Sequence, residues 1–280
     1  MKPDVGSGRY RAGPLLPGLG TGTLTDLFFA SARNYRGVGA SRRRPDGRWE
    51  ELDRADLVER IRRIAAGLRA VGCEAGDRVA ILSHTRLEWG LADWAALLGR
   101  QVAVTVYPVL PADQVSHILR DSGSRLVFAA DGGQLAKLVE IHAELENLET
   151  VVVFDVDQAD LAGETGKGLN VLSLADLEAA GRVSPAFAAF EDEARKIKST
   201  DLATLIYTSG TTGQPKGVML THRNLAANVR QAKSVLPISE SDTCLSWLPL
   251  SHSFERTVGH LLMWSAGVKI AYAESTETVG

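Results

Sequence analysis

The feature that most constrains the fold of this sequence is a repeated alternation of short apolar segments with longer amphipathic ones. Strands are expected at residues 79–82, 102–106, 126–129 and 151–154, and helices at residues 53–71, 88–98, 112–121 and 135–145. Short, continuous apolar runs are typical of strands buried on both faces of a parallel sheet. The chain is therefore predicted to be an α/β protein with mostly parallel sheets flanked by helices.

The remaining segments extend the same pattern toward both ends of the chain. Asp53 is expected to cap the helix that begins there, and Thr221 to cap a helix that runs to about residue 236. Further helices are predicted at residues 25–32, 172–180 and 254–265, strands at 48–52, 217–220, 243–248 and 268–272, a loop at 158–170 and a charged connector at 184–200. Residues 1–22, rich in Gly and Pro, are expected to form a flexible leader before a domain over 23–280.

Composition limits the classes of function. The chain has 280 residues, 45% of them hydrophobic, which is enough for a large core. A net charge of −3 argues against a nucleic-acid surface. The arginines between residues 33 and 69 alternate with acids, which is typical of a solvated helix face, although a weak attraction to anionic lipid headgroups remains an alternative.

Cysteine usage and hydropathy indicate a compartment. Cys73 and Cys244 are far apart and lack metal-ligand spacing, so neither a disulfide framework nor a zinc site is expected. The sequence shows neither a secretory signal nor an apolar run near the roughly 18 to 20 residues of a membrane helix. We therefore expect a cytoplasmic protein whose contact with membranes, if it has any, is peripheral.

The segment from Leu205 to His222 is the strongest functional signal. Its apolar start predicts the end of a buried strand, and the following residues, Ser209 to Gly213, combine hydroxyls with glycines that let the backbone approach a ligand. Lys216 adds a mobile positive charge before a second strand. A Walker loop would place a helix directly after Gly-Lys-Ser/Thr, and neither that pattern nor GxGxxG fits. This arrangement favours a polyphosphate-binding loop over an ordinary polar loop.

The string Tyr-Thr-Ser-Gly-Thr-Thr-Gly-Gln-Pro-Lys-Gly, residues 207–217, resembles the signature loop of the adenylate-forming, or AMP-binding, superfamily. The segment 248–256, Leu-Pro-Leu-Ser-His-Ser-Phe-Glu-Arg, is similar to the next motif in its long-chain fatty acyl-CoA synthetase form. Residues 271–275 continue that subgroup's pattern, and upstream segments from about Thr23 onward match its order. The resemblance thus covers nearly the whole chain.

The resemblance implies roles for particular residues. It implies catalytic roles for Lys216, at the pyrophosphate end of ATP, and for His252, beside the acyl pocket and the α-phosphate. Mg²⁺ would bridge phosphate oxygens, with Thr212 as its protein ligand. The residues implied in binding the β- and γ-phosphates of ATP are Thr208, Ser209, Gly210, Thr211, Thr212 and Gly213.

Several side chains near these motifs allow two interpretations. Phe254 and Trp247 either line an acyl tunnel or belong to the core, and the sequence does not choose between them. Glu255 and Arg256 are expected to form a structural ion pair with each other. Packing roles are expected for Trp264 and Tyr272, and His222 is expected to lie in the first turn of a helix without a catalytic role.

The implied reaction is ATP-dependent activation of a long-chain fatty acid to an acyl-adenylate, followed by transfer to coenzyme A as co-substrate. The family's adenine, metal-binding and C-terminal lysine segments are absent after residue 275, so we expect an N-terminal portion of the family fold that is incomplete at its C-terminus. Such a fragment need not be active by itself. The alternatives are another carboxylate-adenylating enzyme, or a non-catalytic nucleotide- or acyl-binding fragment that needs a complementing C-terminal chain or forms a homo-oligomer.

Overall fold

Two sheets organise the part of the chain that the computed structural model describes, which comprises residues 22–44, 47–155, 168–208 and 214–273. Within these residues the larger sheet has seven strands in the order β7-β6-β5-β3-β4-β8-β9. Its strands are β3 (Arg78–Leu82), β4 (Val102–Val106), β5 (Ser124–Asp131), β6 (Thr150–Asp155), β7 (Asn170–Ser173), β8 (Leu202–Thr208) and β9 (Lys216–Thr221). Neighbouring strands are parallel from β7 to β8, and β9 is antiparallel to β8.

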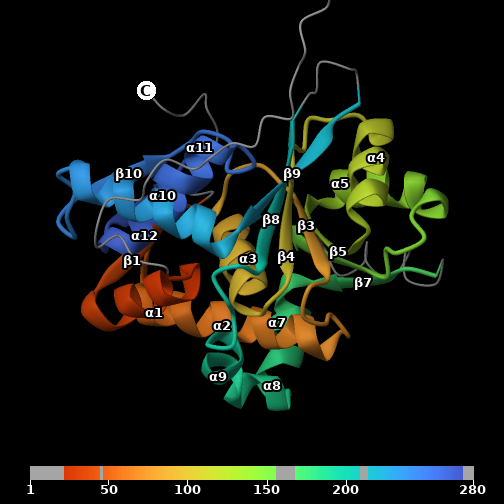
Figure 1. Cartoon of the computed structure of the whole chain (residues 1–280). Helices are drawn as coiled ribbons and strands as arrows, with labels where there is room; N and C mark the ends of the chain where they lie inside the picture. Colours follow the sequence, from red (N-terminus) through yellow and green to blue (C-terminus); the bar gives the residue numbers. More distant parts are fainter. Residues whose placement is uncertain (1–21, 45–46, 156–167, 209–213, 274–280) are drawn as a thin grey trace, which may run out of the picture.

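The central strands are mostly apolar because both of their faces are buried. Val79 and Ile81 of β3 belong to one hydrophobic core, whereas Ala80 and Leu82 belong to the other. Helices α2 (Arg54–Ala70), α3 (Leu87–Leu98) and α7 (Leu174–Val183) cover the first face, and α4 (Ala112–Ser122) and α5 (Gly132–Ile141) cover the second (Figure 1). The predicted α/β class, with mostly parallel strands between helices, is confirmed.

The second sheet has the order β10-β11-β1-β2 within the described ranges. It consists of β1 (Val38–Arg43), β2 (Trp49–Asp53), β10 (Thr243–Ser246) and β11 (Lys269–Tyr272). Strand β1 pairs in parallel with β11, where Ala40 lies opposite Ile270, so the beginning and the end of the described chain share one sheet. The same region contains α1 (Leu24–Asn34), α10 (His222–Val235), α11 (Ser253–Glu255), a π-helical turn (Arg256–Leu262) and α12 (Met263–Ala266) (Figure 1).

Most predicted elements are present, and the differences are local. Strands β1 and β7 were not predicted, since their residues carry few large apolar side chains and depend on pairing with distant strands. The connector at 184–200 contains two short helices, α8 (Pro185–Ala188) and α9 (Phe190–Ala194), because Phe190 and Ala194 pack into the core. A 3₁₀ turn, η1 (His142–Glu144), extends α5 over the rest of its predicted range.

The predicted helix caps differ in outcome. Thr221 and Asn224 form a complete capping box at the start of α10, as expected from their spacing. Asp53 stands at the N-cap of α2, but its side chain makes no capping hydrogen bond. The predicted leader at residues 1–22, except for residue 22, and most of the predicted loop at 158–170 lie outside the described residues.

The interpretation of residues 33–69 as a solvated arginine face is wrong at Arg54. This side chain is only 2% exposed, and its guanidinium lies 4.7 Å from the ring centroid of Trp264. It donates hydrogen bonds to Ser31 and to the carbonyl oxygens of Trp264 and Val268. Arg54 therefore joins α2 to α1 and to the segment before β11, which sequence periodicity could not show.

Candidate functional site: a hairpin and a helix turn at the end of β4

The signature segment forms an antiparallel hairpin at the edge of the larger sheet. Strand β8 leads into the loop and β9 leads out of it, and their last pair is Thr208 opposite Lys216. The predicted strands on both sides are therefore present. The five candidate residues between these strands lie outside the described residues: Ser209, Gly210, Thr211, Thr212, with its predicted metal contact, and Gly213.

Thr208 and Lys216 mark the two sides of the mouth of this loop. Both residues are exposed. The side chain of Lys216 makes no hydrogen bond or ion pair with the residues that the structure describes, so its ammonium group is accessible to an anion. A flexible lysine in this position can reach a phosphate as a point charge.

Helix α4 holds both arms of the hairpin. The Tyr207 hydroxyl donates a hydrogen bond of 2.6 Å to Oδ2 of Asp121, and Nε2 of His117 lies 3.0 Å from the carbonyl oxygen of Pro215. Burial, together with the hydrogen bond to Asp121, raises the pKa of Tyr207 well above its ordinary value. The phenol therefore stays protonated and keeps its role as a donor at physiological pH.

The second motif, residues 248–256, is attached near the ends of β3 and β4. The Thr85 hydroxyl donates to the carbonyl oxygen of Leu248 at 2.6 Å and accepts from the backbone N–H of Leu250 at 2.9 Å. Ser251 donates to the carbonyl oxygen of Val106 at 3.2 Å. These bonds fix the loop that precedes His252 against the carboxyl edge of the larger sheet.

His252 is exposed at the N-cap of α11. Its Nδ1 accepts a hydrogen bond of 3.2 Å from the backbone N–H of Phe254. In the neutral ring the proton therefore resides on Nε2, which can donate to an oxygen of a substrate. The backbone thus fixes both the orientation and the tautomer of the imidazole.

The structure brings the hairpin and His252 to one end of β4. Thr105 of β4 is level with Ile206 of β8, and the next residue of β4, Val106, accepts the hydrogen bond from Ser251. His252 follows Ser251 directly, and Thr208 lies two residues after Ile206. Two motifs that are far apart in the sequence therefore meet at the carboxyl edge of a parallel sheet, where ligands of open α/β folds bind.

The aromatic residues near the second motif divide into two groups. Trp247 is 42% exposed and Phe254 is 57% exposed, so the interpretation of these two as core residues is wrong. Trp264 and Tyr272 are buried, as predicted. His222 is the first residue of α10, and burial lowers its pKa to about 4. The absence of a catalytic role for His222 stays a prediction.

The predicted ion pair between Glu255 and Arg256 is wrong. Glu255 accepts a hydrogen bond of 2.7 Å from Ser246, whereas Arg256 forms a bidentate pair with Asp93. Consecutive residues of a helix project about 100° apart, so these two side chains reach different neighbours. Sequence proximity suggested a partner that the helix geometry does not allow.

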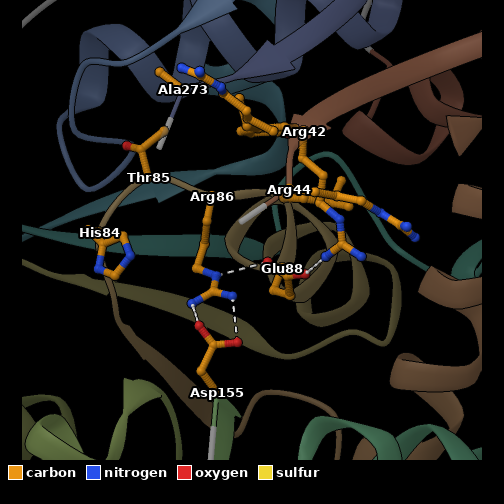
Figure 2. A pocket seen from close by; sticks show the side chains of 11 residues that line it. Arg42, Arg44, His84, Thr85, Arg86, Glu88, Asp155 and Ala273 are labelled. Atoms are coloured by element: carbon orange, nitrogen blue, oxygen red, sulfur yellow. Dashed lines mark hydrogen bonds and ion pairs between the residues drawn. The ribbon is translucent and has the colours of Figure 1, made fainter. Parts of the chain in front are cut away.

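A pocket of about 640 Å³, which the sequence interpretation missed, opens where strands of both sheets end. Figure 2 shows Arg86 between two carboxylates: it lies 2.6 Å from Asp155 and 2.8 Å from Glu88. Glu88 also pairs with Arg42 at 2.7 Å. Burial, followed by the positive charge of Arg86, lowers the pKa of His84 below its ordinary value. Arg86 and Asp155 closely follow predicted strands, and this position in the sequence could have indicated the pocket.

The described residues add two further observations. Within this part of the chain, none of the helices combines the length and apolar character needed to cross a membrane. Cys73 and Cys244 are both free thiols.

Comparison with known proteins identifies the family. The model of the AMP-binding enzyme family matches residues 28–279. A long-chain-fatty-acid–CoA ligase of Mycobacterium bovis is 36% identical over 76% of this chain and 34% of its own length. Fatty acyl-CoA synthetase A of Dictyostelium discoideum is 33% identical over 88% of this chain and 37% of its own length. The chain therefore spans about a third of the length of these relatives.

Solved structures show the same fold. The adenylation domain of a carboxylate reductase from Mycobacterium chelonae superimposes with a TM-score of 0.77 at 24% identity, over 94% of this chain and 44% of that one. An anthranilate CoA ligase in complex with anthranoyl-AMP gives a TM-score of 0.77 at 22% identity, over 95% of this chain and 47% of that one. The hairpin, the second motif and the match over nearly the whole chain lead to one conclusion: the chain belongs to the AMP-binding enzyme family.

Proposed function

We propose that this chain carries the phosphate-binding and acyl-orienting elements of a long-chain fatty acyl-CoA synthetase. The intact enzyme would activate a long-chain fatty acid with ATP to an acyl-adenylate and then transfer the acyl group to coenzyme A. The observation that carries the proposal is the convergence of the signature hairpin and His252 at the end of β4. The names of the relatives support the choice of a fatty acid as substrate.

The charges at this edge suit the first half-reaction. When a carboxylate attacks the α-phosphate of ATP, negative charge develops on the departing pyrophosphate and must be offset by positioned cations and donors. Lys216 supplies an accessible positive charge beside the loop. The Nε2–H of His252, whose orientation is fixed through Phe254, supplies a donor for an oxygen of the acid or of the adenylate.

Mg²⁺ belongs to the proposal as the partner of ATP. The described residues contain no group of three or more His, Cys, Asp or Glu placed to hold a metal ion. We propose that Mg²⁺ arrives with the nucleotide and would offset the negative charge of its phosphates. Thr212 stays the predicted protein contact.

The setting of the enzyme is also proposed. A fatty acid partitions into membranes, so peripheral contact of a cytoplasmic protein with a membrane surface would shorten its path to the site. A complementing chain that carries the family's adenine-binding and metal-binding motifs is part of the proposal, and a homo-oligomer is the alternative assembly.

The test is acid-dependent exchange of radiolabelled pyrophosphate into ATP, measured with a panel of acids. The account predicts that a long-chain fatty acid supports exchange and that aromatic acids and amino acids do not. The panel is run with the chain alone and with a polypeptide that carries the missing motifs. Exchange driven by an aromatic or amino acid instead would contradict the proposed substrate class.

A further inference from the structure

The segment in which α11 continues into the π-helical turn is attached to both sheets. Glu255, which is 6% exposed, accepts a hydrogen bond of 2.7 Å from the Ser246 hydroxyl at the end of β10. Arg256, which is 1% exposed, reaches Asp93 of α3 and Thr204 of β8. Two neighbouring side chains thus connect one helix turn to the smaller sheet on one side and to the larger sheet on the other.

The guanidinium of Arg256 is held at three points. Its Nε donates to Oδ2 of Asp93 at 3.0 Å, its Nη2 to Oδ1 of Asp93 at 2.6 Å, and its Nη1 to the Thr204 hydroxyl at 2.6 Å. Thr204 in turn donates to the carbonyl oxygen of Ala103 in β4 at 2.6 Å. Asp93 and Thr204 are fully buried. Because the guanidinium is planar and rigid, these bonds fix both distance and orientation.

This network joins the two motifs of the candidate site. Thr204 lies four residues before Thr208, in the strand that leads into the signature loop. Arg256 lies four residues after His252, and its backbone N–H donates to the carbonyl oxygen of His252 at 3.1 Å. One side chain therefore bridges the strand of the loop and the turn that carries the histidine.

Stability alone is a weak reason for such a residue. A buried ion pair is often no more stabilising than well-packed apolar side chains of similar volume, because desolvation offsets the attraction between the charges. The three directed bonds do provide something an apolar contact cannot, which is a single relative placement of the elements they join. The geometry suits a residue that fixes the position of the His252 turn relative to α3 and β8.

We infer that Arg256 is a positioning residue, which acts through Thr204 and Asp93 to hold the His252 turn in register with the signature hairpin. The consequence for nucleotide binding rests on the proposed function. The position of the His252 turn relative to the hairpin does not depend on the proposed function, and it can be measured without any ligand.

The test removes one bond of the network and measures the distance between hairpin and turn. Spin labels are placed on cysteines at Lys216 and Ser253, both exposed, in a background with Cys73→Ala and Cys244→Ser. Double electron–electron resonance then gives the distance distribution in the parent, in Thr204→Val and in Arg256→Lys. Thr25→Val is the matched control, since Thr25 is buried in α1 and its hydroxyl has no partner among the described residues.

The inference predicts that Thr204→Val and Arg256→Lys broaden the distribution or add a second distance, while Thr25→Val leaves the parent distribution unchanged. Parent-like distributions in both network variants, in samples that unfold cooperatively, would overturn it. Equal broadening in Thr25→Val would also overturn it, because any buried threonine would then have the same effect.

Calorimetric titration with MgATP, without labels, separates the inference from the proposed function. If the parent binds MgATP, Thr204→Val is expected to raise the Kd roughly three- to tenfold, the range that corresponds to one lost hydrogen bond. An unchanged Kd would overturn the link between this network and the nucleotide. If the parent does not bind, the assignment of the hairpin as the phosphate site of this chain fails, and the distance measurement still decides the role of Arg256.

Discussion

Buried charged and titratable side chains explain much of what the individual residues do in this chain. Arg54 and Arg256 are both nearly inaccessible, and each joins segments that are distant in sequence through several hydrogen bonds. His222 and His260 are buried beside this polar interior, at 2% exposure each. Burial is the main cause that lowers the pKa of each histidine to about 4.

These two histidines make stability depend on pH. In the unfolded chain a histidine titrates near its model value of 6.5, whereas the folded pKa of each is about 4. Below the unfolded pKa, the unfolded state binds protons that the folded state does not, so the free energy of unfolding falls as pH falls. The stabilisation is fully present above pH 6.5 and is lost down to about pH 4.

Urea unfolding measured between about pH 7 and pH 4.5 checks this prediction. The free energy of unfolding of the His222→Gln variant is expected to depend less steeply on pH than that of the parent. The difference between the two slopes corresponds to about one bound proton. If the parent and the variant have the same slope across this window, His222 is not the buried neutral group described above.

At the scale of elements, helices α2 and α7 pack with unusually close backbones. A Cβ on Gly181 would lie 1.9 Å from the carbonyl oxygen of Arg63, and a Cβ on Gly67 would lie 2.4 Å from that of Leu177. Each glycine thus meets the backbone of the opposite helix. The contact sets the distance between two of the helices that cover one face of the larger sheet.

The variant Gly181→Ala is therefore expected to destabilise the fold by about 3 kcal/mol, because the added methyl group meets backbone atoms that cannot rotate away. Gly132→Ala is the matched control, since a Cβ at this first residue of α5 has open space around it. Chemical denaturation gives the free energy of unfolding of both variants. A loss of stability at Gly181 no larger than that at Gly132 would show that the helices can separate at little cost.

The elements also show where sequence reasoning succeeds. The apolar runs of β3 to β6 were predicted because a strand buried on both faces must be apolar throughout. Strand β1 was missed because its sequence, VGASRR, is mainly polar and small, and it is ordered by pairing with β2 and β11. Local pattern encodes burial, but it does not encode partners that are more than two hundred residues away.

The candidate site was predictable to a similar extent. Spacing and composition located Lys216 and the hairpin, and the resemblance located His252. The attachment of Ser251 to β4 and the pairing of Arg256 with Asp93 were not predictable, since each joins segments separated by well over a hundred residues. The charged pocket around Arg86 was missed for the same reason: its residues come from four separate strand ends.

At the scale of the whole molecule, the smaller sheet and the larger sheet meet around the second motif. Thr85 and Ser251 anchor this motif to the larger sheet, while Glu255 attaches it to the smaller one through Ser246. Thr208, Lys216 and His252 are exposed. The arrangement brings the described ends of the hairpin and the imidazole donor to one edge of the larger sheet.

Calorimetric titration of the purified 280-residue chain with MgATP decides whether the hairpin binds phosphate. Binding is predicted, and Lys216→Ala should weaken it about tenfold, because a charge-assisted contact to phosphate is lost. Lys196→Ala is the control, since Lys196 is an exposed lysine that pairs with Glu193 away from the hairpin. No binding by a cooperatively folded sample, or equal binding by Lys216→Ala, would contradict the assignment of this hairpin as the phosphate site.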